Sequence, residues 1–270
     1  MLKKLSLLIA ASALMAACAE QSNTALEMNA QQNGVIGGDE VSANSAIARS
    51  TIGLYDAKNS ALCSGTLIAP NLVLTAAHCV DPSSDELVVF FGQNFKDAKN
   101  NPQLLRKTVK ALQHGDYNPK RGEDTYDIAM VRFEGALPAG YAPAPLLKDF
   151  SAVQKNSRVI VAGFGLNWSW GVKKGAGVLR TTDLKVKKPL YGSSEIMIDQ
   201  SLRKGICSGD SGGPAYVEVN GQLQLMGVAS RGDSLPIPLT PDCFILSIFT
   251  RVDFHASWIQ STAQQLLSIQ

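Results

Sequence analysis

The sequence has little net charge, no internal repeat and almost no helical periodicity. Its formal net charge is only +2 over 270 residues, and its basic pairs, at residues 173–174 and 187–188, are short. Such small clusters normally lie on solvated surface, so the sequence does not predict a nucleic-acid partner. The composition, with 45% hydrophobic residues, is neither that of a disordered chain nor that of a fibre. The chain is therefore expected to be globular and long enough for one large core or two smaller ones.

The apolar run at the N-terminus is too short to span a membrane stably. In MLKKLSLLIAASALMAACAE, Lys3 and Lys4 precede an apolar run from Leu5 to Ala17, and small residues follow. This layout is typical of a secretory signal. A buried N-terminal helix is the less favoured alternative, because such a helix would not usually lack polar positions on every face. We therefore expect an exported protein, either secreted or anchored to a membrane and facing the periplasm or the outside.

An odd number of cysteines suggests that one of them has a separate role. Export permits disulfides, and four of the five cysteines can pair while one is left over. Cys18 ends the segment LMAAC, which resembles the lipobox of bacterial lipoproteins, in which the cysteine is lipidated. The alternative is ordinary signal-peptidase cleavage after Ala19, with Ala17 and Ala19 as the small pair. Lipidation of Cys18 also accounts for the odd cysteine, so we expect a lipoprotein signal over 1–18 and possible membrane attachment there.

The chain after the signal is expected to be all-β. Residues 19–34 are polar and aperiodic, which favours a pro-segment, and order should begin near Val35. From there, short β-rich runs recur between turn residues: TLIAPNLVLT, ELVVFFG, DIAMVRF, RVIVAGFG, EIMID, AYVEV, LQLMGVAS and FILSIFT. Asn220–Gly221 predicts a two-residue hairpin turn between two of them. Only the tail from residue 253 has helical spacing, with Phe254, Trp258, Ile259 and Leu266 on one side.

Three short segments carry residues suited to one reaction. They are LTAAHCV around His78, YDIAMVRF around Asp127 and GICSGDSGGPA around Ser211. A serine hydroxyl is a poor nucleophile unless a base takes its proton, and the base works best when a carboxylate fixes its tautomer. Glycines flank the serine, as expected where the backbone must approach another group closely or adopt positive φ. The three residues are candidates for nucleophilic catalysis.

At these residues the chain resembles the chymotrypsin/trypsin-like serine proteases. VIGG (35–38), TAAHC, DIAM, AGFG (162–165), GDSGGP and FTRV occur in the family order. The resemblance implies two packed six-stranded antiparallel β-barrels and a C-terminal helix, with a peptidase domain over 35–270. Its first barrel would cover 35–140 and its second 141–252, joined near the proline-rich stretch 137–146, and the helix would cover 253–270.

The same resemblance implies a serine endopeptidase acting through an acyl-enzyme on proteins or peptides, without a metal or other cofactor. His78 would be general base and then acid, Asp127 the orienting carboxylate and Ser211 the nucleophile. The N–H groups of Gly209 and Ser211 would form the oxyanion hole. The resemblance also implies two disulfides, Cys63–Cys79 and Cys207–Cys243.

The family pattern further implies activation by proteolysis. The new terminus would be Val35, whose ammonium would pair with Asp210, the residue before the serine. Residue 34 is glycine rather than the arginine or lysine common in the family, which leaves the activating protease open. An uncleaved chain would leave a buried charge unpaired, which is costly, so it should be poorly organised around the serine.

The specificity pocket is expected to be open and largely uncharged. Gly205 aligns with its floor, where trypsin-like members carry aspartate, while Gly232 and Ser247 align with its walls and Ser230 supports the triad carboxylate and the substrate backbone. Such a slot favours bulky apolar or aromatic side chains over Arg or Lys. Arg231 replaces the family's usual tryptophan, the stretch 232–243 is longer than usual, and Asp233 or Asp242 could bend into the pocket.

Two other functions are considered. GDSGG also fits the nucleophile elbow of α/β-hydrolase esterases, in which Asp233 or Asp242 and then His255 would complete the triad. That fold needs strand–helix alternation, which is nearly absent before residue 253, so His255 is expected at the start of the last helix and His114 in a loop or at the surface. The other alternative is a non-catalytic binding module, but the triad and the glycine frame are intact.

Overall fold

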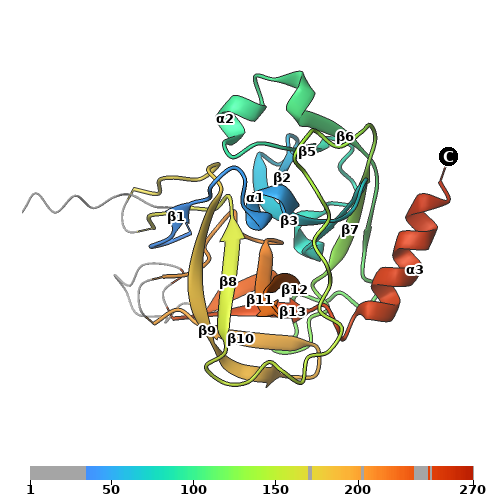
Figure 1. Cartoon of the computed structure of the whole chain (residues 1–270). Helices are drawn as coiled ribbons and strands as arrows, with labels where there is room; N and C mark the ends of the chain where they lie inside the picture. Colours follow the sequence, from blue (N-terminus) through green and yellow to red (C-terminus); the bar gives the residue numbers. More distant parts are fainter. Residues whose placement is uncertain (1–34, 170–171, 202–203, 234–242, 244, 270) are drawn as a thin grey trace, which may run out of the picture. The chain divides into compact units, whose positions relative to one another are not determined.

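The structure is a computed structural model that describes residues 35–169, 172–201, 204–233, 243 and 245–269 (Figure 1). The predicted signal peptide over 1–18, the expected lipidation of Cys18 and the predicted pro-segment 19–34 lie outside the described residues. In the described part of the chain, no helix is both long and apolar enough to cross a bilayer. Strands dominate, which confirms the expected fold class.

The first barrel is a closed six-stranded antiparallel sheet in the order β2-β3-β4-β7-β6-β5. Its strands are β2 (Thr51–Asp56), β3 (Ala61–Ala69), β4 (Leu72–Thr75), β5 (Leu87–Phe90), β6 (Leu105–Gln113) and β7 (Ala129–Phe133). All four residues of β4 are buried, as its uninterrupted apolar sequence predicts. Gly53 lies against Phe90, whose ring atoms would be 1.9–2.5 Å from an added Cβ, so only glycine lets this ring fill the barrel.

The second barrel follows the order β9-β10-β13-β12-β11-β8 and is closed by pairing of β8 with β9. Its strands are β8 (Arg158–Gly163), β9 (Arg180–Tyr191), β10 (Glu195–Asp199), β11 (Pro214–Val219), β12 (Gln222–Asp233) and β13 (Leu246–Arg251). Val219 pairs with Gln222, and Asn220 and Gly221 have φ of 52° and 75°. The predicted two-residue hairpin is therefore confirmed, in the conformation that asparagine and glycine favour.

The first described residues belong to the second barrel. The two-residue strand β1 (Asp39–Glu40) pairs with β9, and Ile36 forms a bridge with Gly205. Val35 is fully buried in the hydrophobic cluster of that barrel. The structure therefore puts residues 35–40 with the second barrel, although the sequence analysis grouped them with the first. The reason is that the apolar side chain of Val35 is buried in that cluster.

Short helices and one long helix complete the fold. They are α1 (Ala46–Ser50), α2 (Phe95–Ala98), α3 (Ala256–Leu267) and two 3₁₀ turns, Ala77–Cys79 and Pro102–Leu104. Although α3 follows the second barrel in the chain, it packs beside β7 of the first (Figure 1). Arg132 of β7 donates to the carbonyl of Leu266 at 2.9 Å. Ile259 and Leu266 are buried as predicted, whereas Phe254 is 44% exposed.

The α/β-hydrolase alternative is wrong, because the described strands form barrels and do not alternate with helices. His255 is the residue before α3, as expected, but it is buried, with 3% of its surface exposed. His114 lies nearby, in the loop after β6 as expected, and is half-buried with an exposed side-chain fraction of 11%. The two rings are 5.1 Å apart, and His114 lies 5.1 Å from Trp258, so both histidines serve packing.

Acid sensitivity is expected from this histidine pair. Burial lowers the pKa of His255 to about 4, and His114 adds to the effect. The folded state therefore holds neutral His255, while the unfolded chain takes up a proton below pH 6.5, so the stability present above pH 6.5 is lost as pH falls towards 4. His255→Phe should reduce the loss of unfolding free energy between pH 7 and pH 4 by about 2–4 kcal/mol. Denaturant titrations at both pH values measure it, and an unchanged difference would contradict the assignment.

Candidate active site

His78 lies directly after β4, in the 3₁₀ turn Ala77–Cys79. Its backbone N–H donates to Asp127 Oδ1 at 3.0 Å, and its Nδ1 lies 2.7 Å from Asp127 Oδ2. The carboxylate thus contacts both the backbone and the ring of the histidine. Because Nδ1 faces a carboxylate, the ring proton is on Nδ1 and Nε2 is the free base. About a third of the side chain is exposed, so Nε2 can reach a ligand.

Asp127 precedes β7 and is 4% exposed. Its Oδ2 accepts a second hydrogen bond, from Ser230 Oγ of β12 at 2.7 Å, and its backbone carbonyl accepts one from Thr250 Oγ1 at 2.9 Å. Residues of the second barrel therefore hold a carboxylate of the first. Its negative charge also acts on Tyr117, whose pKa rises to about 12, mainly because the phenol is buried.

Ser211 lies on the loop before β11, and that loop packs against the first barrel. The carbonyl of Ser211 accepts a hydrogen bond from Ser64 N at 2.8 Å. Gly212 lies against Thr75, the last residue of β4, and Ala76, the residue after it, so that an added Cβ would lie 2.0 Å from Thr75 Oγ1. Ser211 is thereby held beside the segment that leads into His78. No hydrogen bond links Ser211 Oγ to His78 in the described residues.

Three backbone N–H groups of this loop, those of Ser208, Gly209 and Ser211, have no partner among the described residues. Asp210, Gly212 and Gly213, by contrast, each donate their N–H to a carbonyl within the loop or in β12. Gly209 has φ of +97°, and a Cβ there would lie 2.8 Å from Gly165 Cα. A turn that only glycine fits therefore leaves these donors available beside the serine.

Asp210 is a fully buried carboxyl with no ion-pair partner in the described residues. It accepts hydrogen bonds from Gly165 N at 2.7 Å and Cys207 N at 2.8 Å. Burial raises the pKa of Asp210 to about 7, although these two donors and the charge of Arg180 oppose the rise. Gly163 and Gly165 both approach the carboxyl closely. The site would readily accept a cation.

Val35 lies on the same barrel as this carboxyl. It is fully buried, and its neighbour Ile36 accepts a hydrogen bond from Gly205 N at 3.0 Å, five residues before Asp210. Val35 has φ of 44°, an unusual value for a β-branched residue. The turn is closed by Gly38 N, which donates to the Val35 carbonyl at 2.6 Å.

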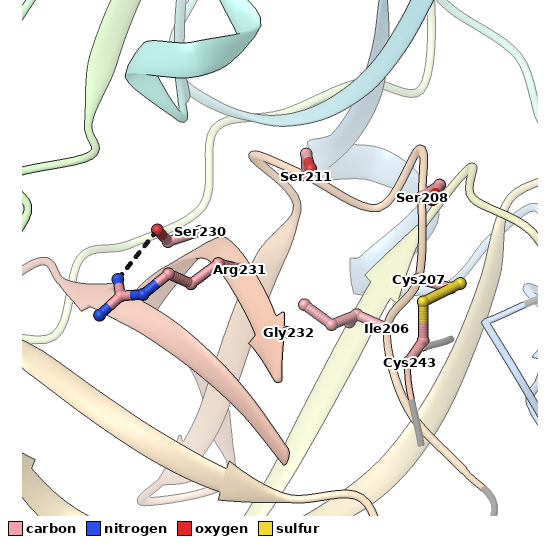
Figure 2. A pocket seen from close by; sticks show the side chains of 8 residues that line it. All are labelled: Ile206, Cys207, Ser208, Ser211, Ser230, Arg231, Gly232 and Cys243. Atoms are coloured by element: carbon pink, nitrogen blue, oxygen red, sulfur yellow. Dashed lines mark hydrogen bonds between the residues drawn. A yellow bond between two sulfur atoms is a disulfide. The ribbon is translucent and has the colours of Figure 1, made fainter. Parts of the chain in front are cut away.

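A pocket of about 250 Å³ opens beside Ser211 (Figure 2). It is smaller than most small-molecule sites, which measure about 300–1,000 Å³, and it suits a single side chain. Its lining residues are Ile206, Cys207, Ser208, Ser211, Ser230, Arg231, Gly232 and Cys243. The side chain of Ile206 projects from the serine loop towards β12, while that of Arg231 points away from the disulfide (Figure 2).

The pocket includes two of the four residues predicted for it. Ser230 and Gly232 line it. Gly205 and Ser247 are buried and are not among its lining residues: Gly205 packs on Gln200, and the Ser247 hydroxyl has no partner in the described part of the chain. The sequence analysis did not find Ile206 and Ser208, although both lie within five residues of Ser211. Asp242 lies outside the described residues, as does the side chain of Asp233.

Both predicted disulfides are confirmed. Cys63–Cys79 joins β3 to the turn of His78, and Cys207–Cys243 joins the serine loop to the segment before β13, with both cysteines lining the pocket. Cys63, Cys79 and His78 are also the group with metal-ligand spacing among the described residues, with ligand atoms within 4.8 Å. Because both sulfurs are in a disulfide, they are not the thiolates that zinc requires.

Comparisons with known proteins agree with this architecture. The family model described as Trypsin matches residues 35–259. The chain is 30% identical to chymotrypsin-like elastase family member 1 of Canis lupus familiaris, over 84% of this chain and 91% of that protein. The same identity and coverage hold for chymotrypsin-like elastase family member 1 of Homo sapiens. It is 26% identical to the urokinase-type plasminogen activator of Gallus gallus over 74% of this chain, and spans half of that longer protein.

Proposed function

Because the chain belongs to the trypsin family of serine proteases and is a serine endopeptidase, we propose that it cuts peptide bonds through an acyl-enzyme on Ser211. His78 Nε2 takes the hydroxyl proton while Ser211 Oγ bonds to the substrate carbonyl carbon. The tetrahedral intermediate then breaks its C–N bond, and the imidazolium returns the proton to the leaving amine. Water attacks the remaining ester by the same route and frees the acid and Ser211.

The observation that carries this proposal is the chain of hydrogen bonds between the two barrels. Asp127 contacts the ring of His78 at 2.7 Å and accepts Ser230 Oγ at the same distance. Ser230 and Ser211 line one pocket, so the serine that donates to Asp127 shares that pocket with the proposed nucleophile. Gly209 N and Ser211 N, two of the donors without partners among the described residues, support an oxyanion hole at the same place.

Active-site labelling tests the proposal against the binding-module alternative. The protein, cut so that it begins at Val35, should react with a fluorophosphonate probe, and peptide mapping should find the adduct on Ser211. A Ser208→Ala variant is a matched control, because Ser208 lines the same pocket but has no role in the reaction. A correctly cut protein that never labels would favour a binding module.

The pocket supports a preference for bulky apolar or aromatic side chains. Its described lining contains Ile206, Gly232 and a disulfide, and no described carboxylate lines it. Arginine or lysine substrates would therefore lack the buried ion pair that their charge requires. Cleavage of a peptide library by the mature protein measures this preference, and efficient cutting after Arg or Lys would contradict it.

The buried carboxyl supports activation by cleavage after Gly34. Val35 already lies on the barrel that holds Asp210, and Asp210 lacks a cation among the described residues. A new α-ammonium at Val35 would supply that cation and hold the serine loop in its active form. The two disulfides are consistent with export, because disulfides persist in oxidising compartments. The proposal also includes a lipid anchor on Cys18 and a separate activating protease.

Asp210→Asn is expected to abolish the gain of activity that cleavage brings. The amide oxygen of asparagine can still accept a hydrogen bond from Gly165 N or Cys207 N. The amide lacks the negative charge that would pair with the Val35 ammonium. The cut variant should therefore label with fluorophosphonate no faster than the uncut wild type, although it remains folded by circular dichroism. Equal labelling of the cut variant and the cut wild type would remove the Val35–Asp210 pair from the proposal.

Gly209→Ala is expected to lower kcat by about 10²–10³-fold, the effect of losing one oxyanion donor. The new Cβ meets Gly165 Cα at 2.8 Å, and φ at this position is +97°, so the N–H must turn. Gly221→Ala is the matched control, because that glycine also has positive φ but has open space around it. Steady-state kinetics compare the two, and similar losses in both would contradict a specific role for Gly209.

A further inference from the structure

The loop that leads into Asp127 has an unfavourable backbone conformation. Asp124 and Tyr126 have φ of 50° and 54°, and neither is glycine. Each such residue raises the energy of the backbone and persists only where its surroundings hold it. Because these two residues lie within three positions of Asp127, whatever holds them also sets where the carboxylate points.

The turn before β10 holds the first of these residues. The Asp124 carboxylate accepts hydrogen bonds from Ser193 N at 2.8 Å and from Ser194 N at 2.7 Å. The Ser194 hydroxyl also donates to it at 2.7 Å. These charge-assisted bonds tie a loop of the first barrel to the second.

Glu195, the first residue of β10, continues the contact and is completely buried. Its carboxylate accepts hydrogen bonds from Asp124 N at 3.2 Å and from Thr125 N at 3.1 Å. Thr125 Oγ1 donates to the same group at 2.7 Å. A buried carboxylate therefore binds the backbone of the strained loop directly.

Arg231 neutralises Glu195 from β12. Its Nη1 and Nη2 donate to the two carboxylate oxygens at 2.7 Å and 2.8 Å, a bidentate pair. Nη2 also donates to the carbonyl of Gly122 at 2.8 Å, in the same loop. Nη1 lies 3.4 Å from Ser230 Oγ, the contact drawn in Figure 2. The planar fork of arginine makes all these contacts at once, which lysine cannot do.

We infer that the Glu195–Arg231 pair is a positioning device for Asp127, which fixes the loop before it and the Ser230 hydroxyl that donates to it. The inference rests on the proposed function, since Asp127 must orient His78 for the device to matter. Arg231 Nη1–H points at Ser230 Oγ, so the Ser230 proton is left to face Asp127. Arg231 donates to Ser230 and Ser230 donates to Asp127, and each of these two hydrogen bonds strengthens the other by polarising the shared hydroxyl.

Stability alone does not explain the pair. A buried ion pair is weak evidence for stability, because the desolvation of both charges offsets their attraction. This pair, moreover, links three segments that meet at Asp127, and Arg231 lines the substrate pocket. The charged or titratable groups that face Asp127 include His78, Tyr117 and Arg231, with Glu195 behind the arginine.

Three variants separate positioning from charge. Arg231→Gln removes a positive charge, Glu195→Gln removes a negative one, and the double variant restores the net charge with amides that can still hydrogen-bond. Because the double variant buries no unpaired charge, it stays informative if a single variant does not fold. Arg158→Gln is the control, since Arg158 forms an exposed ion pair with Asp183 on β8 and β9.

Positioning predicts that kcat of the double variant falls about tenfold, the effect of about 1.4 kcal/mol in the transition state, while KM stays within about twofold. The acid-side midpoint of the pH–kcat/KM profile should move up in Arg231→Gln and down in Glu195→Gln, and return near the wild-type value in the double variant. Arg158→Gln should change neither quantity. A double variant with wild-type kcat would overturn the inference.

A measurement without turnover separates this inference from the proposed function. In a Ser211→Ala background, the ring-proton NMR signals of His78 report how the imidazole is held by Asp127. Positioning predicts that the Nδ1 proton signal broadens or shifts in the double variant but not in the Arg158→Gln control. An unchanged signal would overturn the inference even if the protein proved inactive, whereas an inactive wild type with a changed signal would contradict only the proposed function.

Discussion

Replacing Ser211 with alanine is expected to lower kcat by about six orders of magnitude, the loss that removal of the nucleophile causes in other serine proteases. In the proposed reaction the Ser211 hydroxyl is the group that bonds to the substrate carbonyl, and alanine has no nucleophilic atom to replace it. The fold should survive, because the contact that holds this loop uses the Ser211 carbonyl and Ser64 N. Activity on a peptide substrate and the thermal unfolding midpoint measure the two effects.

The control for this experiment is Ser208→Ala, the change of an exposed serine in the same pocket. It should keep turnover within a few-fold of the wild type. If a folded Ser211→Ala variant retained normal turnover, Ser211 would not be the nucleophile.

Replacing Asp127 with asparagine is expected to lower kcat by about four orders of magnitude, as the same change does in the trypsin family. The carboxylate here faces three donors: His78 N, His78 Nδ1 and Ser230 Oγ. The side-chain amide of asparagine must point its NH₂ group at one of these donors. When the NH₂ group faces Nδ1, Nδ1 must accept a hydrogen bond, so the ring proton of His78 lies on Nε2. In that tautomer the histidine cannot take a proton from Ser211.

The pH dependence distinguishes a wrong tautomer from a damaged fold. The variant should keep the thermal midpoint within a few degrees and still bind a peptide inhibitor, while its residual activity rises with hydroxide concentration. Asp116→Asn is the matched control, because that carboxylate is 72% exposed beside His114. An Asp127→Asn enzyme with normal turnover would contradict the assignment of the orienting residue.

The sequence predicted the strands that are buried on both faces better than those with one face in water. The runs around β4, β7 and β8 are almost entirely apolar, and their positions were correct. Strands β2, β6 and β9 were not among the predicted runs, and β2 is an exception to this trend because five of its six residues are buried. In β6 and β9, lysines occupy many of the solvent-facing positions, which lowers the apolar density on which the prediction depended.

The segments around His78, Asp127 and Ser211 could be recognised in the sequence because each is a short run of consecutive residues. By contrast, no local pattern links Glu195 to the loop at Asp124, which lies 71 residues earlier in the chain, or to Arg231. The contact of Glu195 with that loop arises only when the two barrels pack, and its pair with Arg231 arises only when β10 and β12 fold into the same barrel. The lining by Ile206 was missed for a similar reason: which side of the serine loop faces the pocket depends on β12.

In the activation proposed above, the backbone conformation of Val35 would favour cleavage after Gly34 over the reverse reaction. A β-branched residue with φ of 44° raises the energy of the intact chain by about 1–3 kcal/mol. That torsion exists only while residue 34 is attached, so hydrolysis releases the strain at the same moment as it creates the ammonium. Resealing the bond would have to restore the strain and withdraw the new charge from Asp210. The proposed cleavage should therefore be effectively irreversible, and its rate should depend on how often the turn at 35–38, in which Val35 and Gly38 are buried, opens to a protease.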